Sequence, residues 1–445
     1  MHAQQSHVIK RQILEVEISE KKDHTLSEDL TQLFYYELKP KLEQLMDRLA
    51  PRDIVFNLDH LHLDLGVIPA SQLTAEFSKR FLDELEKKVQ QLTVVKHSLG
   101  SSNHEREENV GAVSKSRSAQ LEEAFFFFVE KGRLPWWFQV DSIEDFEAQL
   151  KTLRPQDLLR VLKKSEHSAR VCRRIVAQFS SSFISVLVES ILPKRATMVL
   201  VHPVKDKVKV QILRLILTQG MPLLEHAITN NKTEKTAQVL KKIKSLLAKA
   251  SEDEKITDKA IEREVLIAVS SSRKLALEVE EMYVHNAGVV LLWPFLDRFF
   301  SALGLVQQRQ FKDRAAQERA ILLIEYLATS HEKIPEYDLV LPKLLCNFPL
   351  DEPIVNHLAL STKEVEESEK LLGAVVNHWG TLKNTSPLAL QEAFLQRDGK
   401  LSQVSNGWSL QVEQKGYDVL LGDLPWGIGL VQLGWMGEMV IVEWN

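Results

Sequence analysis

Two histidines and an aspartate stand at alternate positions in the stretch FNLDHLHLDLG, residues 56–66. In an extended chain alternate side chains share a face, so His60, His62 and Asp64 would lie together on one side of a strand. Imidazole and carboxylate are zinc ligands, and such a site would suit a metal-dependent enzyme or a delivered toxin. We favour a solvated strand face, because same-face neighbours lie roughly 6.5–7 Å apart and a third ligand would need help from elsewhere. We therefore expect no metal and no cofactor.

Other spacings that carry catalytic chemistry are absent from the sequence. It contains no HExxH, CxxC, GxGxxG, P-loop or GxSxG pattern, so no motif brings together a nucleophile, a base and an acid. We expect a non-enzymatic protein without catalytic residues.

Tryptophans gather in short phrases that contain proline, glycine or both in most cases. The phrases are GRLPWWF at 132–138, LPWGI at 424–428, LGWM at 433–436 and VEW at 442–444. A Pro-Trp step presents a large amphipathic ring from an extended backbone, which suits a docking surface or a core corner. Because tryptophan is highly buried on average, we favour the core and keep docking as the alternative. The candidate interaction residues are Trp136, Trp137, Pro425, Trp426, Trp435, Met436 and Trp444.

The bulk composition is that of an ordinary soluble protein. With 56 basic and 61 acidic residues, the chain has no basic excess that would point to nucleic acid as a partner. Its longest apolar run, about residues 288–296, is far shorter than the roughly 20 residues that cross a bilayer, so we expect no membrane anchor. The N-terminus has no apolar signal segment, which indicates the cytoplasm. Cys172 and Cys346 are predicted to be free, buried thiols.

The fold class that these patterns predict is mainly α and multi-domain. A small α+β domain with β-α-β-α order opens the chain, and a small β element closes it. In the first domain we expect a strand within 8–18, a helix from Thr25 to Pro51 with a kink at Pro40, a strand over 56–66 and a helix over 69–92.

Changes in composition divide the chain into five predicted segments. A polar, serine-rich stretch cannot offset its ordering entropy and is expected to be a flexible linker. Helical spacing then continues until glycine and alternating residues replace it near the C-terminus. The segments are the β-α-β-α domain (1–96), the linker (97–118), helical hairpins (119–285), a helical C-terminal domain (286–400) and a Trp/Gly-rich β element of three or four strands (401–445).

Several phrases, in their order, carry a family resemblance. The chain resembles the tape measure protein family of contractile injection systems, phage-tail-like particles in which a sheath surrounds a rigid tube. The resemblance covers nearly the whole chain. It rests on HVIKRQILEVEI (7–18), LDHLHLDLG (58–66), FVEKGRLPWWF (128–138), AGVVLLWPFLDRFFSALGL (287–305), RAAQERAILLIEYLAT (314–329), LPKLLC (341–346), AVVNHWGTLKNTS (374–386), FLQRDGKL (394–401), and LPWGIGLVQLGWM with VEW (424–444).

The resemblance also bears on single residues. It implies a structural strand at 58–66, in which Asp64 and Gly66 look like turn makers and Gly66 allows a positive φ. Gly434 stands where similar sequences often carry proline. The chain is also shorter than many members between its Trp-Trp phrase and its C-terminal block, which implies a short particle or a length set elsewhere.

The resemblance implies an assembly protein that sets tube and sheath length, with tube, baseplate or sheath proteins of the same particle as partners. A ruler should be extended, and 445 residues in one helix would reach about 670 Å. The caps, prolines and tryptophans instead indicate a compact chain with a radius of gyration of about 22 Å. A compact scaffold or chaperone for baseplate or tube assembly is therefore the alternative. We expect the protein in the cytoplasm during assembly, and a later place inside the tube stays open.

Overall fold

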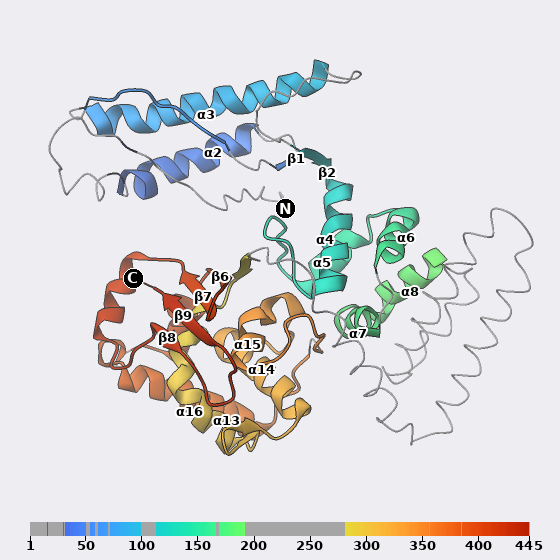
Figure 1. The fold of residues 1–445 in the computed structure, drawn as a ribbon, viewed down its shortest axis with the longest axis vertical. Coiled ribbons are helices and arrows are strands. Elements are labelled where there is room, and N and C mark those ends of the chain that lie inside the picture. The colour runs from blue at the N-terminus through green and yellow to red at the C-terminus, as the bar shows by residue number, and fades with distance from the viewer. Residues whose placement is uncertain are drawn as a thin grey trace, which may run out of the picture. The chain divides into compact units, whose positions relative to one another are not determined.

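The computed structural model describes residues 16, 30, 32–49, 54–57, 61–69, 72–98, 113–165, 169–191, 281–355, 357–383 and 385–444. The chain divides into two compact units, Met1–Leu121 and Glu122–Asn445. The described elements are mainly helical, with a small C-terminal sheet (Figure 1), which confirms the mainly α prediction at this level. No helix among the described residues is long and apolar enough to cross a membrane.

The first unit contains two helical segments that pack on each other through leucine side chains. The π-helical segment η1 (Leu33–Leu38) leads into α2 (Lys39–Leu49), and α3 (Leu73–Ser98) packs against them. The π segment ends two residues before Pro40, a residue whose backbone nitrogen carries no N–H. Leu42, Leu45 and Leu85 form a buried cluster between α2 and α3.

Residues 61–69 differ from the predicted strand over 56–66. Strand β1 covers Ile54–Asn57, and 61–69 have no regular structure. The expected alternation persists, because Leu61 and Leu63 pack on the α2–α3 cluster while His62 and Asp64 are exposed. The Asp64 carboxylate accepts the Gly66 N–H at 2.9 Å, and Gly66 has φ +63°. These two residues therefore make the expected turn, which ends the extended stretch.

The partner of β1 comes from an unexpected place. Strand β2 (Val113–Ser116) pairs antiparallel with β1, and α4 begins at Arg117, so the predicted linker 97–118 contains a strand and the start of a helix. The polar composition of residues 97–118 gave no periodic apolar signal for this strand. Of the first predicted strand, within 8–18, the structure describes Val16, which has no regular structure and is 48% exposed rather than facing a core.

Five helices open the second unit around an aromatic core. The helices are short because start signals follow one another closely along the chain. Ser142 caps the start of the helix Ile143–Leu150, accepting the Asp145 N–H at 3.1 Å, and Pro155 is the first residue of the next helix. Phe125, Phe128 and Phe179 lie in the core with further rings at 4.8–6.1 Å. The helices are α4 (Arg117–Lys131), α5 (Ile143–Leu150), α6 (Pro155–Lys164), α7 (Ala169–Gln178) and α8 (Ser181–Ile191).

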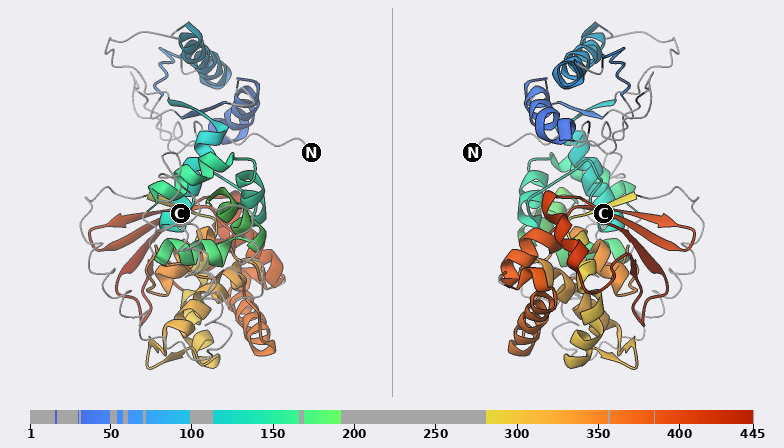
Figure 2. Two further views of the ribbon diagram at one scale, coloured as in Figure 1. Left: turned by 90° about the vertical axis from the view of Figure 1, so that its right-hand side faces the viewer. Right: turned by 90° about the vertical axis from the view of Figure 1, so that its left-hand side faces the viewer.

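The C-terminal part, residues 281–445, combines helices with the sheet. Its helical elements lie on one face of the sheet (Figures 1 and 2). A two-stranded ribbon, β4 (Val306–Gln307) and β5 (Gln310–Phe311), stands apart from that sheet. The helical elements are η5 (Ala287–Leu292), α13 (Trp293–Ala302), α14 (Arg314–Thr329), η6 (Glu336–Leu339), α15 (Val340–Leu345), α16 (Thr362–His378), η7 (Gly380–Leu382), α17 (Pro387–Leu390), η8 (Gln391–Leu395) and η9 (Gly416–Asp423).

The C-terminal sheet has five strands in the order β3-β6-β7-β9-β8, rather than the predicted three or four. β3 (Glu281–Val284) adds the extra strand from before the helices, and β7 and β9 pair in parallel. Gly416–Asp423, within the predicted β element, form the 3-10 segment η9 instead, with the Asp418 N–H bonded to the Lys415 carbonyl at 2.9 Å. The remaining strands are β6 (Gly399–Val404), β7 (Gly407–Val412), β8 (Leu430–Val431) and β9 (Met439–Glu443).

One continuous apolar core closes the C-terminal part. Val440 and Val442 of β9 face it, together with Leu401 and Leu410 from the neighbouring strands, whereas Ile441 is 39% exposed on the other face. Among the described residues, this core cluster takes no member from residues 122–191. The helices α4–α8 and the C-terminal part therefore have separate cores within one unit.

Candidate functional site

Helix α7 presents two chemically different faces. Val171, Cys172 and Ile175 are fully buried, in keeping with the free, buried thiol predicted for Cys172. The opposite stripe carries Arg170, Arg173, Arg174 and Gln178, which the spacing of three and four residues places on one side of the helix. This stripe contacts residues 336–354 of the C-terminal part, and we call this interface the α7 contact.

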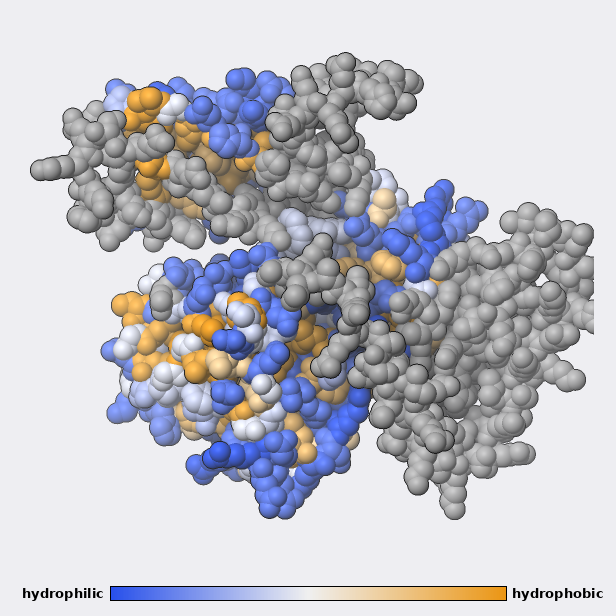
Figure 3. Space-filling model, viewed as in Figure 1, coloured by the Kyte–Doolittle hydropathy of each residue, from blue (hydrophilic) through white to orange (hydrophobic). Residues whose placement is uncertain are grey.

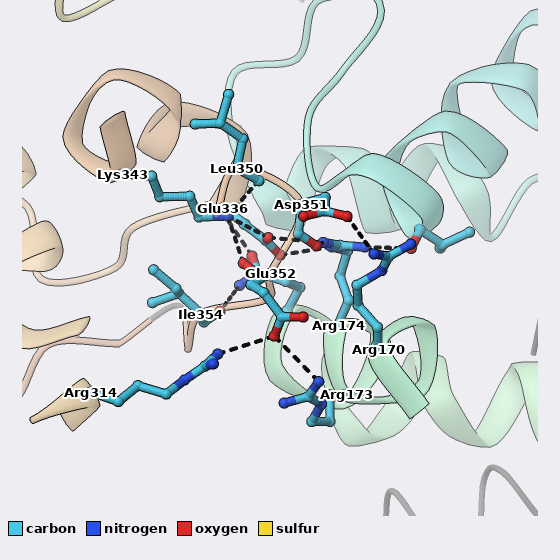
Figure 4. A network of polar contacts seen from close by, with 12 residues as sticks. Arg170, Arg173, Arg174, Arg314, Glu336, Lys343, Leu350, Asp351, Glu352 and Ile354 are labelled. Carbon is cyan, nitrogen blue, oxygen red and sulfur yellow. Dashed lines mark hydrogen bonds and ion pairs between the residues drawn. The ribbon is translucent and has the colours of Figure 1, made fainter. Parts of the chain in front are cut away.

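Arg174 forms the centre of the α7 contact (Figure 4). Its guanidinium donates to both carboxylate oxygens of Glu336, with Nε–Oε2 3.0 Å and Nη2–Oε1 3.2 Å, and neither side chain is exposed. Further bonds reach the carbonyls of Val129, at 2.6 Å, and of Asp351. The pair is therefore a bidentate, fully desolvated ion pair, with two further bonds from the guanidinium to backbone carbonyls.

Lys343 approaches the same carboxylate from within the C-terminal part. Its ammonium donates to Glu336 Oε1 at 2.8 Å and to the carbonyls of Leu350 and Glu352 at 3.1 and 2.8 Å. Burial lowers the pKa of Lys343, and the negative charge of Glu336 opposes that shift. Glu336 thus shares its charge between a cation of its own domain and one that comes from α7.

Further polar contacts surround this centre. Gln178 accepts the backbone N–H of Glu336 at 2.9 Å and donates to the Ile354 carbonyl at 2.6 Å. Arg170 pairs with Asp351, and Arg173 pairs with Glu352 at 3.3 Å, a carboxylate that Arg314 also contacts at 3.0 Å. At the exposed rim, Lys333 reaches Glu144 of α5 at 2.6 Å. The contact is built from charges and amides, and its carboxylates are engaged in pairs rather than placed for proton transfer.

Within the phrase FVEKGRLPWWF, position 132 requires a glycine. It has φ +75°, and a Cβ at this position would lie 2.4 Å from Glu336 Oε1 and 2.9 Å from Arg174 Nη2. A side chain at position 132 would therefore strain the backbone and collide with the ion pair. The glycine both ends α4 and leaves room for the α7 contact.

A second titratable cluster lies beside η6. Burial, followed by the charge of Asp338, raises the pKa of Glu325 to about 8. Asn286 donates to Glu325 and, at 2.9 Å, to the Asp338 carbonyl. Burial raises the pKa of Asp338 to about 6, and nearby His285, bonded to Asp398 at 2.6 Å, opposes the shift. The cluster can store a proton near neutral pH.

The tryptophans proposed as interaction residues fall into two groups. Trp435 and Trp444 are each 4% exposed and Met436 is buried; Trp435 donates to the Leu345 carbonyl at 2.9 Å, and Trp444 to Asp418 at 3.1 Å. Pro425 is exposed and Trp426 half-buried, with its indole N–H bonded to the Leu291 carbonyl at 3.1 Å. Trp136 is 36% exposed and Trp137 half-buried. The surface therefore offers Pro425, Trp426, Trp136 and Trp137, while the others lie in the core.

Just before Trp426 in the sequence, the segment η9 adds exposed apolar side chains. Val419 is 78% exposed and Tyr417 39%, and η9 contains no buried residue. Figure 3 shows apolar residues at the surface on this side of the C-terminal part. We call Tyr417, Val419, Pro425 and Trp426 the η9 ledge.

The residues proposed as metal ligands do not assemble a site in the described part of the chain. His62 and Asp64 are exposed, His60 lies outside the described residues, and the Asp64 carboxylate caps its turn. Within the described ranges, no group of three histidine, cysteine or acidic side chains is placed to hold a metal ion.

Sequence reasoning missed the α7 contact. The available signal was the arginine stripe at 170, 173 and 174 opposite an acidic pair at 351–352. Such a stripe normally indicates a solvated helix face, and no local pattern connects it to Glu336, 162 positions away.

Comparison with known proteins gives one match. A family model described as contractile injection system tape measure protein matches residues 6–444. No curated protein and no solved structure matches the chain.

Proposed function

Because this chain belongs to the family of contractile injection system tape measure proteins, we propose that it sets the length of the tube and sheath while such a particle assembles. The observation that carries this proposal is the extent of the family match, which covers both compact units from residue 6 to residue 444. The family is structural, so the role requires no catalytic residue.

The length-setting role requires one part of the chain to stay folded and another part to measure length. Residues 281–445 close around one core with fully buried rings such as Trp379, and opening it would forfeit the stability of a whole domain, roughly 5–15 kcal/mol. We therefore assign this part as a folded end piece. The chain before it would measure length, at about 1.5 Å for each helical residue.

A compact scaffold or chaperone for baseplate or tube assembly is the second candidate. It is favoured by the separate, closed cores of helices α4–α8 and of the C-terminal part. In this role the chain would act without extending, and the number of its residues would not determine the length of the particle.

The η9 ledge is the surface that we assign to docking on a tube, baseplate or sheath protein of the same particle. Its apolar side chains are exposed to water to differing degrees, Val419 most of all at 78%. In the proposed sequence of events the protein acts in the cytoplasm during assembly and then enters the particle tube.

Particle length distinguishes the two candidates. An in-frame deletion between 206 and 250, a stretch outside the described residues, leaves both described parts of the second unit intact. Shorter particles support the ruler, whereas particles of normal length, or none, support the compact factor.

A further inference from the structure

We infer that the α7 contact is a releasable latch, through which helices α4–α8 detach as a folded body from the folded C-terminal part. The inference concerns the opening of the chain and does not depend on the length-setting role, because it is measured on the purified protein.

The first argument is the chemistry of the contact. Arg170, Arg173, Arg174 and Gln178 face carboxylates and carbonyls of residues 336–354. Permanent interfaces are mostly apolar, whereas contacts that open and close are more polar. Buried charges contribute little net stability because they lose hydration on burial, and here each would regain water on separation.

The second argument is that both bodies keep their cores when they part. The described core cluster of the C-terminal part takes no residue from 122–191. On the other side, Phe179 packs on the rings of Phe125, Phe128, Phe146 and Phe183. Among the described residues, the aromatic pair that crosses the contact is Phe128 with Tyr337, at 6.2 Å between ring centroids. Release therefore exposes little apolar surface compared with unfolding either body.

The third argument is the position of Lys343. When Arg174 leaves, Glu336 keeps the Lys343 ammonium at 2.8 Å, so the C-terminal part retains a paired carboxylate. A latch needs this property, because a buried charge left without a partner would make release and unfolding the same event.

Arg174→Met tests the latch, with Arg319→Met as the matched control. Arg319 also forms a bidentate pair, with Glu364 at 2.6 Å for both bonds, but that pair lies entirely within the C-terminal part. The readout is a carbodiimide crosslink between Lys333 and Glu144, whose exposed side chains meet at 2.6 Å across the contact. A crosslink between Lys370 and Glu367, both on α16, serves as the internal standard.

We expect Arg174→Met to lower the docking equilibrium constant by roughly 100-fold, so that the Lys333–Glu144 crosslink is lost. The Lys370–Glu367 crosslink and the amide protection of β7 and β9 should remain at wild-type level. Arg319→Met should keep the crosslink across the contact. An unchanged Lys333–Glu144 yield in Arg174→Met would overturn the latch. Loss of this crosslink accompanied by loss of the amide protection of β7 and β9 would also overturn it.

A second variant covers the case in which Arg174→Met does not fold. Arg170→Ala with Arg173→Ala removes two partly exposed pairs, whose arginine side chains are 25% and 30% exposed. A partial loss of the Lys333–Glu144 crosslink with β7 and β9 still protected supports the latch. Wild-type yield from this variant contradicts it.

Discussion

Arg174 and Glu336, 162 positions apart in the sequence, form a bidentate ion pair in which neither side chain is exposed to solvent. The pair joins the helices that begin the second unit to the C-terminal part, although each has a core of its own. Because Lys343 also contacts Glu336, the two ends of the pair are not equivalent. This asymmetry gives the first prediction.

Glu336→Gln should destabilise the protein more than Arg174→Met does. The first substitution leaves two buried cations, Arg174 and Lys343, without their carboxylate, a loss of about 3–5 kcal/mol. The second leaves a matched Glu336–Lys343 pair. Urea unfolding of the full chain, followed at neutral pH, measures both values. An equal or larger cost for Arg174→Met would show that Lys343 does not stabilise the carboxylate.

Gly132→Ala should cost more than the backbone strain alone predicts. Gly304→Ala is the matched control, because its φ of +71° is similar and its nearest neighbour is the flexible end of Lys312 at 3.4 Å. We expect about 1–2 kcal/mol from the left-handed backbone in both variants. At Gly132 the collision with Glu336 adds to this. Equal changes in the free energy of unfolding would mean that the ion pair moves aside without cost.

The buried carboxyl cluster predicts a pH dependence of stability. The pKa of Glu325 rises from 4.5 to about 8 on folding, so between these values the folded state holds a proton that the unfolded state has lost. Stability from this group is therefore complete below about pH 4.5 and is lost as pH rises through about 8. Asp338, with its pKa raised to about 6, acts in the same direction at lower pH, as does His285, whose pKa Asp398 raises.

The measurement is urea unfolding at pH 6 and pH 8.5. Wild-type protein should be less stable at pH 8.5 by on the order of 2 kcal/mol. Glu325→Gln keeps a polar group beside Asn286 but cannot ionise, so most of this difference should disappear. If the variant keeps the wild-type difference between the two pH values, Glu325 is not the group that titrates.

The buried and exposed apolar residues of the C-terminal part should behave oppositely. Trp435→Ala removes a ring packed on Phe300 and Phe311 and should cost about 3–5 kcal/mol. Val419→Ser changes a side chain that is 78% exposed and should alter stability by less than about 0.5 kcal/mol. Thermal unfolding measures both.

Docking is checked with the same Val419→Ser protein. If the η9 ledge binds a particle protein, this stable variant should no longer co-purify with tube, baseplate or sheath proteins. Trp136→Ala, a change at another exposed site, serves as the comparison. If Val419→Ser co-purifies as fully as Trp136→Ala does, the η9 ledge is not the docking surface.

Local patterns in the sequence predicted the local features of the fold. The Asp64–Gly66 turn and the inward-facing leucines 61 and 63 follow from backbone chemistry and periodicity, and each is present. The change to a C-terminal sheet was visible for the same reason. Strand β3 was not, because Glu281–Val284 pairs with β6 more than a hundred positions later and no local signal specifies such a partner.

The functional residues were harder to predict, for a physical reason. Trp435 and Trp426 have similar Pro- or Gly-flanked settings in the sequence, yet one is core and the other reaches the η9 ledge, since burial depends on tertiary packing. Arg174 looked like a residue of a solvated helix face. Its burial depends on Glu336, Val129 and Asp351, which come from distant segments and together accept four hydrogen bonds from its guanidinium.

Electron microscopy of particles made with the deletion of residues 206–250 tests the central claim most directly. The deletion removes roughly 45 residues, so a helical ruler predicts particles shorter by about 70 Å, with the length distribution as narrow as in wild type. Replacing the deleted residues with a helix-forming insert of equal residue number should restore the wild-type length, because each helical residue contributes about 1.5 Å. Particles of unchanged mean length would contradict the ruler and leave a compact assembly factor.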